Sequence, residues 1–157
     1  MANIKTNAMR NLEINKIEYN VYTYDSNSDF DGCRVAQKIG KDPGQVFKTL
    51  VTVAPSKKYY VFVIPVLHEL DLKACATSVN EKSVEMIPVK DINKVTGYIR
   101  GGCSPIGMKK QFLTVIDESA LRFDKIIFSA GKIGYQVEVS PNELISLIGA
   151  KTAKITR

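Results

Sequence analysis

Two nearly continuous apolar runs, QVFKTLVTVA (45–54) and KYYVFVIP (58–65), constrain the fold of this chain most strongly. Both are rich in the β-branched and aromatic residues that favour strands. Only Pro55, Ser56 and Lys57 separate them, and so short a connection predicts an antiparallel hairpin. Because neither run has a continuous polar face, we expect both strands to lie centrally in a sheet.

Lys48 is unusual because it lies inside the first of these apolar runs. Side chains alternate along a strand, so Lys48 shares its side with Val46 and Leu50, while Phe47 and Thr49 share the other. A lysine in a strand usually points to solvent. Two apolar neighbours on its own side favour a position in a cleft.

The remaining elements mix short helices and short strands along the whole chain. Spacing of apolar residues and capping signals predict helices at 3–14, 32–39, 71–80, 91–96 and 140–148, with a helical turn at 118–121. Further strands are expected at 17–24, 83–87, 112–116, 125–129 and 135–139. The basic tail at 150–157 is expected to be loosely held. The order of elements predicts an α/β (α+β mixed) domain spanning 1–157, with a mixed, largely antiparallel sheet or partial barrel of about seven strands flanked by the helices.

Composition excludes several classes of protein. The chain has 157 residues, of which 45% are hydrophobic and 24% charged, as in ordinary globular domains. No stretch approaches the roughly 18 apolar residues that would span a membrane. Three widely separated cysteines, Cys33, Cys75 and Cys103, fit a reducing cytoplasm and provide no metal-binding cluster. No nucleotide-binding glycine motif occurs, so we expect neither a metal nor a cofactor.

The stretch GGCSPIGMKK (101–110) is the strongest candidate for a binding loop. Its glycines let backbone N–H groups approach a ligand closely. Arg100, Lys109 and Lys110 place three positive charges and no acid around it, which suits an anionic or carbonyl-bearing ligand. A tight connection between two strands is the alternative. The net charge of +6 leans weakly towards a polyanionic partner.

Side chains offer little for nucleophilic catalysis. His68 is the only histidine, so any histidine-activated nucleophile must use it, and no motif surrounds it. Cys103 has Arg100 and Lys109 near it in sequence, and such cations lower a thiol pKa. A small apolar filler of the glycine loop is the favoured reading of Cys103. The plausible mechanism is therefore binding and electrostatic stabilisation, with a nucleophile that is not a side chain.

Four segments together resemble the YbaK/EbsC-type Cys-tRNA(Pro) deacylases, which are related to the editing domain of bacterial prolyl-tRNA synthetases. The most specific is GYIRGGCSPIGMKK at 97–110, and VFKTL at 46–50 is similar to the F-K-T-L segment of that family. FSAGKIG at 128–134 and YTYD at 22–25 match in order and spacing. The resemblance covers essentially the whole chain.

The resemblance implies an editing-domain fold and a cytoplasmic trans-editing hydrolase. Such an enzyme cleaves the ester between a wrong amino acid, chiefly cysteine, and the 3′-terminal ribose of a misacylated tRNA. In this family the thiol of the substrate cysteine is the expected nucleophile, and the protein positions the groups. The resemblance also suggests prolyl-tRNA synthetase as a partner.

The same resemblance assigns roles to individual residues. Lys48 would hold the ester or the terminal phosphate, and the amides of Gly101 and Gly102 would stabilise the oxyanion. The expected substrate-binding residues are Tyr24, Thr49, Cys103, Ser104, Pro105, Ser129 and Gly131. Arg100, Lys109 and Lys110 are expected to contact tRNA phosphates, although a solvated face is an equal alternative for the lysines.

Two departures and two alternatives remain. Cys103 stands where relatives often have isoleucine, and Gln136 stands where some have aspartate, so no acidic role is expected there. One alternative is a deacylase for another small amino acid, such as Ala-tRNA(Pro), which would need an activated water. The other is a non-catalytic module that binds tRNA or a synthetase.

Overall fold

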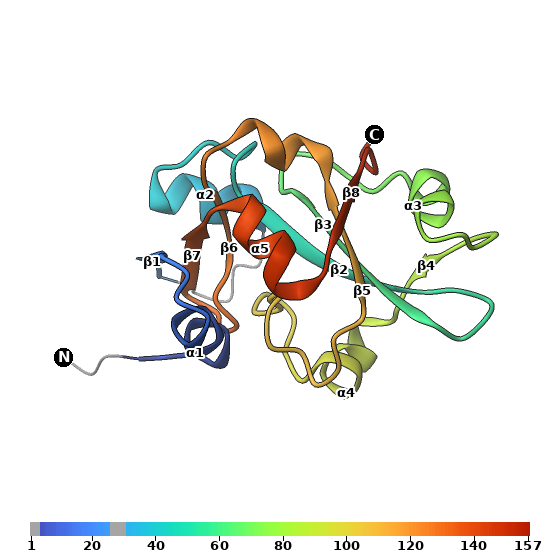
Figure 1. Ribbon diagram of the computed structural model, residues 1–157, viewed down its shortest axis with the longest axis horizontal. Helices are drawn as coiled ribbons and strands as arrows, with labels where there is room; N and C mark the ends of the chain where they lie inside the picture. The colour runs from blue at the N-terminus through green and yellow to red at the C-terminus, as the bar shows by residue number, and fades with distance from the viewer. Residues whose placement is uncertain (1–3, 26–30) are drawn as a thin grey trace.

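The structure is a computed structural model that describes residues 4–25 and 31–157. Within these residues eight strands form two sheets (Figure 1). The strands are β1 (Asn20–Thr23), β2 (Phe47–Val53), β3 (Tyr59–Pro65), β4 (Glu85–Met86), β5 (Leu113–Asp117), β6 (Ile126–Ser129), β7 (Tyr135–Val139) and β8 (Lys151–Ala153). The helices are α1 (Asn7–Ile14), α2 (Gly32–Ile39), α3 (Leu72–Ser78), α4 (Ile92–Thr96) and α5 (Pro141–Ile148), with 3-10 turns η1 (Val89–Asp91) and η2 (Glu118–Arg122). No described helix has the length and apolarity needed to cross a membrane.

The predicted hairpin is confirmed. β2 and β3 pair antiparallel from Phe47 opposite Pro65 to Val53 opposite Tyr59. They lie inside a five-stranded sheet of order β4-β2-β3-β5-β8, in which β3–β5 and β5–β8 are parallel. The other sheet, β1-β7-β6, is antiparallel throughout. The expected mixed fold with largely antiparallel pairing is therefore confirmed, with its strands divided between two sheets that lie side by side in Figure 1.

The five-stranded sheet is buried on both faces, which explains why its central strands are almost continuously apolar. Phe47, Val51 and Val63 point into the larger core, which they share with β6 and β7. Phe62 and Ile64 point into a second core beneath α3. Consecutive residues of β2 and β3 therefore point to opposite faces of the sheet and contribute to different cores.

Helix starts follow the capping signals in the sequence. The Ser140 hydroxyl accepts a hydrogen bond from the Glu143 N–H at the start of α5, which has Pro141 in its first turn. The Asp71 carboxylate accepts from the Ala74 N–H at the start of α3. Both contacts satisfy amides that have no partner inside the helix.

The prediction of a loosely held tail is wrong. Residues 151–153 form β8, which pairs parallel with β5, and Ile155 is fully buried in the second core. The Asp117 carboxylate accepts hydrogen bonds from the Ile155 N–H (3.1 Å) and the Thr156 hydroxyl (3.3 Å). The basic composition of the tail concealed one apolar anchor, because its lysines point outward while Ile155 points inward.

Candidate active site

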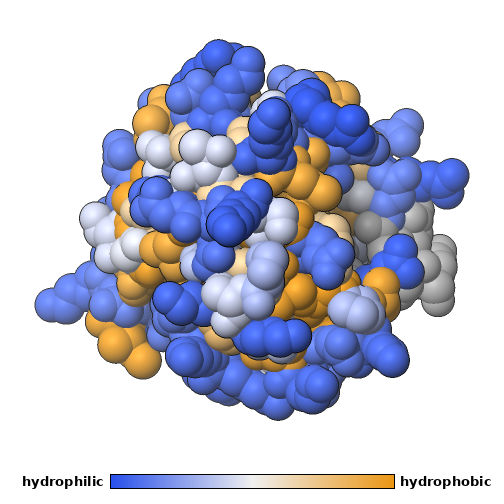
Figure 2. Space-filling model, turned by 90° about the vertical axis from the view of Figure 1, so that its right-hand side faces the viewer, coloured by the Kyte–Doolittle hydropathy of each residue, from blue (hydrophilic) through white to orange (hydrophobic). Residues whose placement is uncertain are grey.

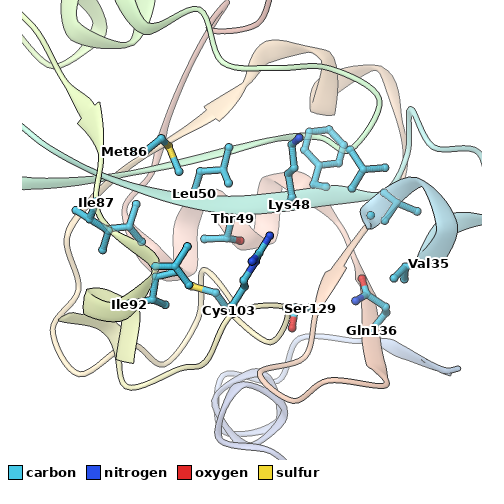
Figure 3. Close-up of a pocket in the computed structure, with 18 of the residues that line it drawn as sticks. Val35, Lys48, Thr49, Leu50, Met86, Ile87, Ile92, Cys103, Ser129 and Gln136 are labelled. Carbon is cyan, nitrogen blue, oxygen red and sulfur yellow. The ribbon is translucent and has the colours of Figure 1, made fainter. Parts of the chain in front are cut away.

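A cavity of about 370 Å³ lies beside the first half of β2 (Figure 3). This volume is in the range that small ligands occupy in proteins. Its walls come from β2, the segment from β4 to the glycine loop, α2 and the strands β6 and β7. The residues discussed below that line it are Tyr24, Val35, Lys48, Thr49, Leu50, Met86, Ile87, Val89, Ile92, Arg100, Gly101, Cys103, Ser129 and Gln136.

The cavity lies where β2 has a free edge. β4 pairs only with Thr52 and Val53, and the Val51 carbonyl accepts one more bond, from the Ile87 N–H (3.2 Å). Main-chain groups of consecutive residues in an antiparallel strand point to opposite edges, so every second residue faces the same edge. Thr49 therefore directs its N–H and C=O to the same edge as Val51, beyond the point where β4 ends.

Lys48 and Thr49 leave β2 in opposite directions, and Lys48 shares its side with Leu50 (Figure 3). The free edge explains how both side chains line one cavity. The half-buried Lys48 forms no ion pair with any residue of 4–25 or 31–157. Its ammonium group is thus available to a ligand.

Thr49 has a buried hydroxyl that bonds to no residue within 4–25 and 31–157, and its side chain leaves β2 on the side opposite Lys48 (Figure 3). An unpaired buried polar atom costs roughly 1–3 kcal/mol. Such atoms are rare in native proteins and call for a specific explanation. A polar group of a ligand in the cavity would satisfy the Thr49 hydroxyl.

The glycine loop contributes Gly101 rather than Gly102 to the cavity wall. Gly101 has a φ of +85°, which favours glycine. The Gly102 N–H donates to the Ile99 carbonyl (2.9 Å) and Gly102 is buried outside the cavity lining. A turn inside the loop already uses the Gly102 amide, so the geometry gives no support to the oxyanion role predicted for it.

Gly102 is instead a packing position. A Cβ atom there would lie 3.3 Å from the backbone nitrogen of Ile133, which is closer than a side chain tolerates without movement. The glycine loop can therefore lie directly against the 129–134 turn, and this contact brings Gly101 and Ser129 to the same cavity.

Three further predicted binding residues also lie outside the cavity lining. Ser104 is fully buried, and its hydroxyl accepts from the Ile106 N–H (3.3 Å). Pro105 is buried beside it. The Gly131 N–H donates to the Ser129 hydroxyl (3.1 Å). Ser104 and Gly131 form hydrogen bonds inside the two turns, and Pro105 is buried next to Ser104. The structure therefore gives no support to the direct contact with substrate that is predicted for these three residues.

Cys103 lines the cavity as a neutral thiol. Burial raises its pKa to about 11, and a hydrogen bond with Thr96 opposes the shift only partly. The only histidine, His68, is exposed and does not line the cavity. Cys103 therefore has neither a low pKa nor a base beside it, which agrees with its interpretation as a filler.

Tyr24 and Ser129 line the cavity from the two outer strands of the small sheet, at the end where Thr23 pairs with Tyr135 and Ser129 with Gln136. The Tyr24 N–H donates to the Gly134 carbonyl (3.0 Å). This bond extends the pairing of β1 with β7 to the mouth of the cavity. Gln136, on β7, is buried and also lines it, so its amide contributes a neutral polar group to the wall.

The predicted cationic residues separate into two groups. Arg100 lines the cavity, whereas Lys109 and Lys110 line a second hollow on the surface. No group of three or more histidine, cysteine or acidic side chains in 4–25 and 31–157 could hold a metal ion.

Sequence reasoning missed the apolar wall of the cavity. Met86, Ile87, Val89 and Ile92 line it from β4, η1 and α4, and Val35 does so from α2. In the sequence these residues look like ordinary apolar positions of short elements. They line a cavity because β4 ends after pairing with Thr52 and Val53 and leaves space beside the rest of β2.

Comparisons with known proteins agree with this geometry. Residues 33–147 match the family described as the aminoacyl-tRNA editing domain. EbsC of Enterococcus faecalis, whose name gives it a provisional Cys-tRNA(Pro)/Cys-tRNA(Cys) deacylase activity, is 48% identical over 153 residues, or 97% of this chain and 93% of EbsC.

Two solved structures share the fold. One is described as a provisional trans-editing enzyme for prolyl-tRNA synthetase, with a TM-score of 0.82 and 23% identity over 98% of this chain and 99% of the other. The second, a hypothetical protein, has a TM-score of 0.85 and 20% identity over 93% and 96% of the two chains. With the family match and the 48% identity to EbsC, the chain belongs to the aminoacyl-tRNA editing domain family.

Proposed function

We propose that this protein is a trans-editing hydrolase that removes cysteine from mischarged Cys-tRNA(Pro). The observation that supports it most directly is the pair of unpaired polar groups on the free edge of β2. Lys48 offers a cation and Thr49 a buried hydroxyl to the same cavity. Among the described residues that line it, no side-chain nucleophile lies beside a histidine base. Family membership and the similarity to EbsC support the same activity.

The reaction has the substrate thiol as its nucleophile. The cysteine sulfur attacks its own ester carbonyl, a C–S bond forms, and the C–O bond to the tRNA ribose breaks. The thiol proton goes to the departing ribose oxygen. Water then opens the cyclic thioester and yields free cysteine. Each bond change involves substrate and water only, so the protein contributes position and charge.

The chain supplies donors to the carbonyl oxygen as it becomes negative. Gly101 and Cys103 line the cavity, and their N–H groups have no acceptor among the described residues. These two amides flank the occupied Gly102 amide and are the oxyanion donors of this proposal. Lys48 adds a full positive charge, which is worth more in a cavity than in water.

The free edge of β2 positions the amino acid itself. The main-chain N–H and C=O of Thr49 can bond to groups that every amino acid has, and its hydroxyl adds one more contact. The apolar wall, which includes Ile87 and Ile92, suits a small polarizable thiol. The side chain that enters must therefore be small.

The deciding experiment compares Cys-tRNA(Pro), Ala-tRNA(Pro) and S-methylcysteinyl-tRNA(Pro) as substrates. We expect release of cysteine alone, because alanine has no thiol and the methylated sulfur has no proton to lose. Release of alanine would support a deacylase that activates water. Binding of tRNA without release of any amino acid would support the non-catalytic module.

We also propose that the enzyme acts in the cytoplasm together with prolyl-tRNA synthetase. Its separate free cysteines suit a reducing compartment. Adding the synthetase to the assay should raise the rate on Cys-tRNA(Pro) relative to Cys-tRNA(Cys). Equal rates with and without the synthetase would contradict the partnership.

A further inference from the structure

A second hollow of about 840 Å³ has five lysines in its wall: Lys57, Lys58, Lys94, Lys109 and Lys110. We call it the lysine groove. No acidic residue lines it. Five of the 22 basic residues of the chain therefore gather on one small surface, and this concentration exceeds what the modest net charge suggests.

Most of this charge is not neutralised. Lys94 lies 3.8 Å from the Asp91 carboxylate, but the other four lysines form no ion pair within the part of the chain that the structure describes. The Glu81 carboxylate, whose pKa is lowered by hydrogen bonds from Tyr60 and Ser56 and by the charge of Lys58, is already occupied by those two hydroxyl donors. The groove thus presents a net positive field to an approaching ligand.

The groove is built on rigid parts of the fold. Its floor includes Tyr59 and Phe112, whose rings meet edge to face at 5.6 Å and pack against the larger core. The Lys109 N–H donates to the Thr96 carbonyl (3.0 Å). The Lys109 side chain covers Gly97, with its Cγ 3.0 Å from the position of a Cβ there.

The lysine groove and the cavity share one wall. Ile92 and Gly101 line the cavity, whereas Lys94 and Lys109 line the groove. The segment 92–110 therefore separates the two hollows. Figure 2 views the side on which the tip of the β2–β3 hairpin lies, where hydrophilic residues cover most of the surface. A ligand anchored in the cavity can continue past the glycine loop onto the lysines.

We propose that the lysine groove binds the sugar-phosphate backbone of the tRNA acceptor stem while the 3′ end occupies the cavity. The inference rests on the proposed function, because that function places the aminoacyl end in the cavity. Lysine ammonium groups act as mobile point charges that suit phosphates. Contacts of this kind position a nucleic acid without reading its sequence.

The test uses the double variant Lys58→Gln/Lys94→Gln. It leaves Lys57 unchanged because its φ is +71°, and Lys109 because it covers Gly97. The matched control is Lys73→Gln/Lys151→Gln, two exposed lysines outside both hollows. Binding of uncharged tRNA is measured against salt concentration. We expect the log–log slope to fall by about two for the groove variant, as for loss of two phosphate contacts, and to stay unchanged for the control.

A kinetic comparison separates the groove from the chemistry. The groove variant should lose about tenfold in kcat/KM on full-length Cys-tRNA(Pro), as expected for two lost charged contacts. On the cysteinyl ester of a short single-stranded oligonucleotide with the tRNA 3′ sequence it should match the unmodified protein. Equal losses on both substrates, or an unchanged salt slope, would overturn the inference.

The two proposals can fail separately. If the unmodified protein hydrolyses neither ester, the proposed function fails. The salt dependence of tRNA binding would then still decide the role of the groove, because that measurement needs no turnover.

Discussion

Tyr98 donates a hydrogen bond from its hydroxyl to the carbonyl oxygen of Ile106, across the glycine loop. Its hydroxyl oxygen lies 2.9 Å from the position that a Cβ atom would take at Gly107, and its ring lies 2.9 Å from that position at Gly131. The Tyr98 side chain therefore holds the two ends of the glycine loop together and packs against the 129–134 turn. The positions of both turns that line the cavity depend on this side chain.

Tyr98→Phe should keep the ring packing and lose the hydrogen bond. The buried Ile106 carbonyl would lose its partner, so we expect the free energy of unfolding to fall by about 1 kcal/mol. Urea denaturation measures it. Tyr135→Phe is the control, because the Tyr135 hydroxyl bonds to no described residue, and an equal loss in both variants would contradict the role of the bond.

Lys48→Ala should lower kcat/KM on Cys-tRNA(Pro) by about 10²–10³-fold, the usual cost of removing one group that stabilises an oxyanion. Lys48 makes no ion pair with the residues that the structure describes, so circular dichroism and the unfolding midpoint should not change. Lys151→Ala, at an exposed position of β8 outside the cavity, should retain full activity. An unimpaired Lys48→Ala enzyme would instead favour the non-catalytic module.

Thr49→Val should raise stability and lower activity together. The substitution removes an unpaired buried hydroxyl, so the free energy of unfolding should increase by about 1 kcal/mol. Loss of one substrate contact should reduce kcat/KM by about tenfold.

Thr52→Val is the matched control for Thr49→Val. The Thr52 hydroxyl, three residues further along β2, is buried and donates to the Tyr60 carbonyl (3.1 Å). Its removal should lower stability. If both valine variants changed the free energy of unfolding in the same direction, the conclusion that the Thr49 hydroxyl has no hydrogen-bond partner would be contradicted.

Cys103→Ser should keep near-normal deacylation, because the thiol is neutral at physiological pH. Burial raises the pKa of this thiol from 9.0 to about 11. The range from pH 6 to 8 lies below both values, so the ratio of kcat/KM between the unmodified protein and Cys103→Ser should not change across it. Loss of activity in a folded Cys103→Ser protein would restore the thiolate mechanism.

The same thiol makes stability depend on alkaline pH. Its pKa is raised in the folded state, so its contribution is complete below the unfolded value of 9.0 and is lost as pH rises through about 11. The difference in unfolding free energy between the unmodified protein and Cys103→Ser should therefore be constant up to about pH 9 and then shrink. A constant difference up to pH 11 would contradict the burial of the thiol.

Ile155→Ala should cost about 2–5 kcal/mol, as for other fully buried isoleucines. Ile155 is 0% exposed and anchors the tail to the second core. Ile99→Ala, at 56% exposure, should change stability by less than about 0.5 kcal/mol. Thermal or chemical unfolding distinguishes the two.

Local patterns in the sequence predicted the parts of the fold that depend on neighbouring residues. The β2–β3 hairpin follows from two apolar runs and a short connection, and the α5 start follows from Ser140 and Pro141. The parallel pairing of Val61 with Thr114 joins residues more than fifty positions apart. No local pattern reports such a pairing, so the division into two sheets was not predictable.

The candidate site shows the same division. Lys48, Thr49 and Gly101 were predicted and line one cavity. The amide of Gly102 is used within its own turn, and a glycine-rich motif cannot show which of its amides are occupied. That information depends on backbone geometry and is visible only in three dimensions.

The free edge of β2 has a consequence for the behaviour of the protein in concentrated solution. An unpaired strand edge can accept a strand from another molecule and start aggregation, and natural proteins often place a lysine there to prevent it. No strand of the described part of the chain pairs with residues 47–50 on one side, and Lys48 is the charged residue among them. The cation that the cavity offers to a ligand is thus also the kind of residue that disfavours pairing of such an edge with a second copy of the chain.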